Sequence, residues 1–123
     1  MAKTVLLVED EPNIIEAISF ILSRAGYQVL SHGDGQTALD AIGRAEPDMV
    51  VLDLMLPGRS GLDILHALRS QPSTETLPVL MLTARGQKTD RDQAERLGVS
   101  SFMTKPFAND AVLGQVRSLI GEA

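Results

Sequence analysis

Five short apolar runs, separated by longer segments with helical periodicity, constrain the fold of this chain more than any other feature. The runs are short and mostly β-branched or aliphatic, which is typical of strands that are buried on both faces of a sheet. They comprise Thr4–Val8, Gln28–His32, Met49–Leu52, Val79–Leu82 and Ser101–Met103.

The segments between these runs predict helices, because their apolar residues recur three or four positions apart. Helix starts are marked by Pro12, by Ser60 and by Asn109-Asp110, and Gly26 marks a helix end. The fourth helix, over about Asp90–Leu97, has the weakest pattern. The apolar stripes of the other helices are Ile14, Ile18, Ile21, Leu22 and Ala25; Ala38, Leu39 and Ile42; Leu62, Leu65 and Leu68; and Val112, Val116, Leu119 and Ile120.

Strict alternation of five strands with five helices implies an α/β fold, in which helices cover both faces of a parallel sheet. The chain has 123 residues, the size of one ordinary domain. A domain of this size buries roughly two thirds of the surface that the unfolded chain exposes, so it needs no disulfide or metal to fold. We therefore expect residues 1–123 to form a single domain.

The composition excludes several classes of protein. The chain has no cysteine, which excludes disulfides and thiolate metal sites. Its net charge of −5, without a basic stripe, argues against direct nucleic-acid binding. The apolar runs are far shorter than the roughly 18 residues of a membrane span, and Met1–Thr4 leads into the first run without a signal-peptide core. We therefore expect a cytoplasmic protein that binds no membrane.

Polar residues with complementary charges follow four of the five predicted strands. Glu9–Glu11 follow the first strand, Asp53 the third, Thr83 the fourth and Thr104-Lys105 the fifth. The carboxyl ends of parallel strands lie along one edge of the sheet, where ligands bind. We therefore expect these acids, the hydroxyl and the ammonium to converge on one crevice, with Asp53 at the mouth of the sheet.

This set of side chains suits phosphoryl transfer. Carboxylates close together repel each other and attract a hard cation, and oxygen-only ligands favour Mg²⁺ over zinc. Lys105 can neutralise remaining charge, the Thr83 hydroxyl can donate to an oxyanion, and Asp53 is placed to act as the nucleophile. Each residue alone is better explained as a helix cap, a loop acid or a surface lysine. These structural roles do not explain why all of the residues fall together on one edge of the sheet.

The stretches "LLVEDE", "MVVLDLMLPGRSG", "PVLMLTARG" and "FMTKPF" strongly resemble the receiver domain of two-component response regulators, over essentially the whole chain. The resemblance implies a doubly wound, flavodoxin-like (βα)5 fold with strand order 2-1-3-4-5. It also implies a signalling switch that is activated by phosphorylation of Asp53, with Mg²⁺ held by Asp10, Asp53 and the backbone carbonyl of Met55. Glu9 would act on the metal mainly through water.

The resemblance further implies that Thr83 and Lys105 bind the phosphoryl group and that the bond before Pro106 is cis. Phe102 would be the switch aromatic, which turns inward as Thr83 moves toward the phosphate. Met55 and Arg85 occupy positions that tune hydrolysis of the acyl phosphate. His32 and His66 are interpreted as solvated or edge residues without a role in the site.

The phosphoryl group would come from a sensor histidine kinase or a histidine phosphotransfer protein, and the output would be a downstream protein or a missing output domain. The chain would catalyse only its own phosphorylation and dephosphorylation, and so is not a conventional enzyme. The pattern is closest to receivers joined to winged-helix domains, but their dimer-forming Asp pair is Ser100-Ser101 here, and their fifth-helix Arg is Gln115. We therefore expect a monomer that dimerises at most weakly.

Two alternatives stay open. A phosphate-independent, receiver-like scaffold would usually lack an acid, the threonine or the lysine, and all of them are present here. An Mg²⁺-dependent aspartyl-phosphate hydrolase would need a second Asp two residues after Asp53, and that position is Met55.

Overall fold

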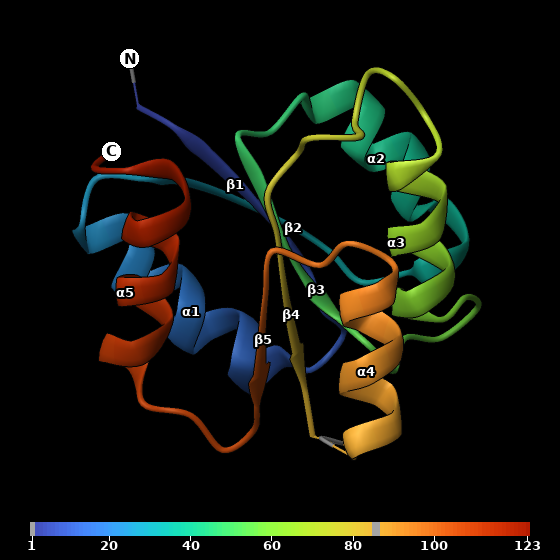
Figure 1. Ribbon diagram of the computed structural model, residues 1–123. Coiled ribbons are helices and arrows are strands. Elements are labelled where there is room, and N and C mark those ends of the chain that lie inside the picture. Colours follow the sequence, from blue (N-terminus) through green and yellow to red (C-terminus); the bar gives the residue numbers. More distant parts are fainter. Residues whose placement is uncertain (1, 85–86) are drawn as a thin grey trace.

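The computed structural model describes residues 2–84 and 87–123, and in them strands and helices alternate along the chain (Figure 1). The predicted strands and helices are all present. Their bounds are β1 Thr4–Val8, α1 Pro12–Arg24, β2 Gln28–His32, α2 Ala38–Ala45, β3 Met49–Asp53, α3 Gly61–Arg69, β4 Val79–Thr83, α4 Lys88–Arg96, β5 Ser101–Thr104 and α5 Asn109–Ile120. A short 3-10 helix, Gly35–Thr37, precedes α2.

The five strands form one parallel sheet in the order β2-β1-β3-β4-β5, the flavodoxin-like order implied by the resemblance. Helices α1 and α5 cover one face, and α2, α3 and α4 cover the other (Figure 1). Each β–α–β connection must cross over the sheet to reach the next parallel strand, which places helices on both faces.

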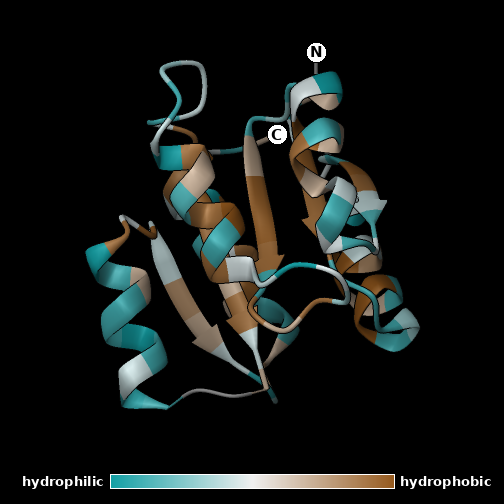
Figure 2. Ribbon diagram, turned by 90° about the vertical axis from the view of Figure 1, so that its right-hand side faces the viewer, coloured by the Kyte–Doolittle hydropathy of each residue, from teal (hydrophilic) through white to brown (hydrophobic). Residues whose placement is uncertain are grey.

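Two apolar clusters, one on each side of the sheet, make up the core. Along β1 successive residues alternate between them: Val5 and Leu7 face α1 and α5, whereas Leu6 and Val8 face α2 and α3. Figure 2 shows the hydrophobic residues concentrated in the strands, while α4 is largely hydrophilic. Helix α4 contributes the buried apolar residue Ala94 to this core, and Leu97, directly after the helix, is partly buried there. So few apolar positions explain why the periodicity of α4 is weak in the sequence.

Three strands extend one residue beyond their predicted ends. Asp53, Thr83 and Thr104 are the last residues of their strands rather than the first residues of loops. In the strand register Asp53 lies opposite Leu82, and Thr83 lies opposite Thr104. Asp53 and Thr83 are therefore held by the sheet itself, which is more rigid than a loop.

The predicted helix ends are confirmed with two corrections. Pro12 occupies the first turn of α1, the Ser60 hydroxyl accepts a hydrogen bond from the Leu62 amide at 3.2 Å, and Gly26 has a φ of 98°. Helix α4 begins at Lys88, two residues before its predicted start, and ends one residue earlier. Helix α5 begins at Asn109 as predicted, but Ala108 is its N-cap, so no side chain caps it.

The carboxyl end of α5 is tied to the opposite edge of the sheet from the acids. The Lys3 ammonium donates to the carbonyl of Ile120, and the Tyr27 hydroxyl donates to the carbonyl of Gly121. These bonds satisfy carbonyls that have no partner within the helix. Among the described residues, no helix is long and apolar enough to cross a membrane.

Candidate functional site

The carboxyl edge of the sheet brings together the residues that the sequence predicts. Glu9 and Asp10 follow β1, Asp53 ends β3, Thr83 ends β4, and Lys105 follows β5. These positions are adjacent because β1, β3, β4 and β5 are neighbours in the sheet. The structure thus places the acids, the hydroxyl and the ammonium along one edge.

An ion-pair network centred on Lys105 organises the acids. Its ammonium Nζ lies 2.9 Å from Glu9 Oε1 and 3.3 Å from Asp53 Oδ2. The Glu9 side chain is 1% exposed and that of Asp53 is 6% exposed, so both carboxylates need a partner. Glu11, at 3.9 Å, is a more exposed third acid on the same ammonium.

Backbone amides fix the orientation of the two buried carboxylates. Glu9 Oε2 accepts hydrogen bonds from the amides of Asp10 and Glu11, at 3.0 and 3.1 Å. Asp53 Oδ1 accepts one from the amide of Met55 at 3.1 Å. Each carboxylate therefore has one oxygen on the backbone and the other on Lys105, which holds both rigidly.

Close backbone approach after β3 requires a glycine at position 61. A Cβ atom there would lie 2.3 Å from the Asp53 carbonyl oxygen, and the Gly61 amide donates to the Leu54 carbonyl at 2.9 Å. Helix α3 therefore starts against the end of β3, and the loop between them turns back beside the site.

Burial and like charge perturb the acidity of the site. Burial, reinforced by Glu9, raises the pKa of Asp53 to about 6, against the lowering effects of the Met55 amide and Lys105. Burial lowers the pKa of the Lys105 ammonium, but the hydrogen bond from Lys105 to Glu9 and the charge of Asp53 outweigh it, so that its pKa is raised. Lys105 therefore stays charged, and Asp53 is mainly ionised at pH 7.

Glu9, Asp10 and Asp53 meet the requirements of a divalent cation. Each offers a carboxylate oxygen, and these oxygens lie within 4.8 Å of one another. Three carboxylates and one ammonium leave the cluster with two formal negative charges, and all the donors are oxygens, as Mg²⁺ prefers. The acidic cluster therefore fits Mg²⁺.

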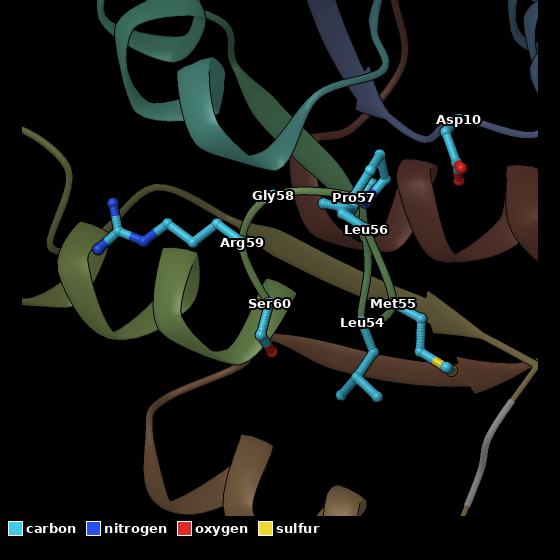
Figure 3. Close-up of a pocket in the computed structure, with 8 residues that line it drawn as sticks. All are labelled: Asp10, Leu54, Met55, Leu56, Pro57, Gly58, Arg59 and Ser60. Atoms are coloured by element: carbon cyan, nitrogen blue, oxygen red, sulfur yellow. The ribbon is translucent and has the colours of Figure 1, made fainter.

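An open hollow lies beside the acids and gives a ligand access to them. It has a volume of about 590 Å³ and is lined by Asp10 and by residues 54–60 of the β3–α3 loop (Figure 3). Met55 is 55% exposed at this hollow, although it is apolar. Asp10, an exposed member of the cluster, connects the hollow with the buried acids.

Thr83 and Phe102 lie on the part of the sheet nearest α4. Thr83 is completely buried, and Phe102 is partly buried against the cluster beneath α3 and α4. The guanidinium of Arg91 lies 4.9 Å from the centre of the Phe102 ring. Sequence reasoning missed this contact, since the two residues belong to different elements and share no motif.

The remaining sequence predictions near the site have separate outcomes. The peptide bond between Lys105 and Pro106 is cis, as the resemblance implies. His32 has a hydrogen-bond partner that the sequence did not reveal, the Thr37 hydroxyl at 2.7 Å, and it lies on the edge strand. His66 is exposed on α3. Arg85 lies outside the described residues.

Comparison with known families agrees with the fold and the site. The family model described as "Response regulator receiver domain" matches residues 5–117. The chain therefore belongs to the response regulator receiver domain family, whose members are signalling switches controlled by phosphorylation.

Curated relatives of the chain are transcriptional regulators about twice its length. "Probable transcriptional regulatory protein TcrX" of Mycobacterium tuberculosis is 44% identical over 117 residues, which are 95% of this chain and 49% of that protein. The phosphate regulon transcriptional regulatory protein PhoB of Escherichia coli is 35% identical over 120 residues, 98% of this chain and 52% of PhoB. The chain spans about half the length of these relatives.

Solved receiver domains have the same fold. The beryllofluoride-activated receiver domain of Klebsiella pneumoniae RstA has a TM-score of 0.88 at 27% identity, covering 96% of this chain and 98% of that one. The receiver domain of the Pseudomonas aeruginosa sensor histidine kinase PA1611 has a TM-score of 0.88 at 28% identity, covering 99% and 100%. That structure has a magnesium ion coordinated in its active-site cleft.

Proposed function

We propose that residues 1–123 form a receiver domain that accepts a phosphoryl group on Asp53 from a histidine kinase or a histidine phosphotransfer protein. The observation that supports this most strongly is the arrangement around Asp53. One oxygen is held by the Met55 amide and the other by Lys105, beside Glu9 and Asp10. An ionised carboxylate fixed in this way needs little reorganisation to act as a nucleophile.

In the proposed reaction a carboxylate oxygen of Asp53 bonds to phosphorus while the bond from phosphorus to the donor histidine nitrogen breaks. The electron pair of the broken bond stays on that nitrogen. The Lys105 ammonium, which is already paired with Asp53, binds a phosphoryl oxygen of the product, and the Thr83 hydroxyl donates to another. Both contacts stabilise charge on the transferred group.

Asp10, Asp53 and the backbone carbonyl of Met55 would hold Mg²⁺, with Glu9 acting on it mainly through water. When bound, this ion would neutralise carboxylate charge and shield the incoming phosphoryl oxygens. The geometry of Glu9 agrees with an indirect role, because both of its oxygens already bind Lys105 and backbone amides.

Phosphorylation would change the face formed by α4, β5 and α5, with Thr83 and Phe102 as the moving parts. The domain would then act in the cytoplasm as a binding module rather than a conventional enzyme, catalysing only its own phosphorylation and dephosphorylation. Its output would be a downstream protein or an output domain in the same polypeptide. Met55 and Arg85 would set how fast the acyl phosphate hydrolyses.

Incubation with acetyl phosphate and Mg²⁺, followed by intact-mass measurement, tests this proposal. We expect a gain of one phosphate that requires Mg²⁺ and is absent in Asp53→Asn. Asp63→Asn on α3 is a matched control, because Asp63 is exposed and should accept nothing. Phosphate uptake by Asp53→Asn at the normal rate would show that the nucleophile is wrong, and no uptake by the unaltered chain would favour the scaffold alternative.

A further inference from the structure

Arg91 has an aromatic ring as its main partner. Its guanidinium lies over Phe102, 4.9 Å from the ring centre, and so links α4 to β5. Within residues 2–84 and 87–123 no carboxylate forms an ion pair with Arg91. A cation over the face of an aromatic ring is attracted by the electron density of that face. The contact therefore favours the present position of the ring.

Phe102 and Thr83 lie on the same face of the sheet, next to each other along the strands. Met81 lies opposite Phe102 in the register, and both contact the cluster beneath α3 and α4. Thr83 is two residues beyond Met81 on β4, and side chains two apart share a face. The ring thus occupies the row next to Thr83, and the Arg91 guanidinium lies over its face.

From this placement we propose that Arg91 is a positioning residue that holds Phe102 in its present position, opposes the inward turn of the ring and so opposes acceptance of a phosphoryl group. This inference rests on the proposed function, in which Phe102 turns inward as Thr83 binds a phosphoryl oxygen. A contact made in only one of two conformations shifts their equilibrium by its own free energy. For a cation–π contact at an exposed residue this corresponds to about a two- to five-fold change in affinity.

Titration with beryllofluoride in the presence of Mg²⁺, followed by ¹⁹F NMR, measures that affinity. Arg91→Gln should bind the phosphoryl mimic about two- to five-fold more tightly than the unaltered chain. Arg91→Lys keeps a cation and should stay closer to the unaltered value. Arg96→Gln removes the same charge from the same helix without touching the ring, and should not tighten binding.

A Phe102→Leu background separates the ring contact from other effects of Arg91. There, Arg91→Gln should no longer change the affinity, because the partner of the guanidinium is gone. In the free protein, ring resonances of Phe102 in Arg91→Gln should shift toward their positions in the beryllofluoride complex. This second readout would not move if Arg91 only stabilised α4.

Failure of the inference is distinct from failure of the proposed function. If the unaltered chain does not bind beryllofluoride with Mg²⁺, the proposed function is wrong and the inference falls with it. If the chain binds the mimic but Arg91→Gln binds equally or more weakly, Arg91 does not oppose the switch. If Arg91→Gln also raises the affinity for beryllofluoride in the Phe102→Leu background, Arg91 does not act through the Phe102 ring and the inference is wrong.

Discussion

Lys105 Nζ lies 2.9 Å from Glu9 Oε1, joining the first and fifth strands through an ion pair between residues 96 positions apart. The Glu9 carboxylate is almost fully buried, and Lys105 is its only cationic partner among the described residues. The pair closes the carboxyl edge of the sheet and leaves one ammonium shared with Asp53.

Lys105→Met should destabilise the metal-free protein by about 3 kcal/mol, because it leaves the buried carboxylates of Glu9 and Asp53 without their shared counter-ion. Urea denaturation in the presence of a chelator measures this change. Adding Glu9→Gln should recover part of the loss, since the double variant has no unpaired charge at Glu9 but still lacks the counter-ion of Asp53. A loss below about 0.5 kcal/mol in Lys105→Met would show that the backbone amides alone satisfy Glu9.

Mg²⁺ should raise the stability of the folded protein by about 2.7 kcal/mol at a hundred times its dissociation constant. Asp53→Asn should weaken this response and stabilise the metal-free protein by about 1–2 kcal/mol at neutral pH, because it removes a buried like charge. Thermal melts with Mg²⁺, Ca²⁺ and a salt control measure both effects. A melting temperature indifferent to Mg²⁺ would argue against a preformed site.

Tyr27 should titrate above its ordinary pKa of 10.0, because burial and, second, the charge of Glu122 raise the pKa of its hydroxyl. Because its pKa is raised in the folded state, the Tyr27 hydroxyl contributes to the free energy of unfolding. This contribution is fully present below pH 10 and is lost as the pH rises through the folded-state pKa. Tyr27 is the only tyrosine and the chain has no tryptophan, so absorbance at about 295 nm reports it alone. Glu122→Gln should lower the midpoint; an ordinary midpoint in the folded protein would contradict the burial of this hydroxyl.

Glu46→Gly should stabilise the protein by about 1 kcal/mol. Glu46 follows α2 with a φ of 46°, a left-handed conformation that glycine adopts without strain. Its carboxylate also lies at the negative end of the helix. Glu46→Ala removes the charge but keeps the Cβ, so most of the gain should be absent there. Equal gains in both variants would assign the effect to charge rather than to backbone strain.

The protein should be a monomer without phosphate and should form no strong symmetric dimer with beryllofluoride. The Ser101 hydroxyl donates to Gln115 at 2.9 Å, and the Ser100 hydroxyl accepts from the Val79 amide, so both are satisfied within the chain. Surface ion pairs across a dimer contribute only about 0–1 kcal/mol each but select register and partner. Here Ser100, Ser101 and Gln115 stand where the Asp pair and the Arg that form such pairs would be. Sedimentation with and without the mimic measures assembly; a tight, mimic-dependent dimer broken by Arg91→Glu would show the opposite.

Much of the fold was predictable because its signals are local. The periodicity of Leu62, Leu65 and Leu68, the proline at position 12 and the capping hydroxyl of Ser60 each act over one or two turns of chain. The prediction was least accurate at α4, where Ala94 is the buried apolar residue and Leu97 follows the helix. It was also less accurate at the start of α5, where no side chain caps the helix.

The sequence by itself determined that Glu9, Asp10, Asp53, Thr83 and Lys105 meet at one edge, because parallel strands share their carboxyl ends. Only the tertiary structure decided which of them pair. Burial forces Glu9 and Asp53 onto a single ammonium, and the packing of α4 against β5 places Arg91 over Phe102. These contacts depend on distances between elements remote in the chain, for which no local pattern of residues exists.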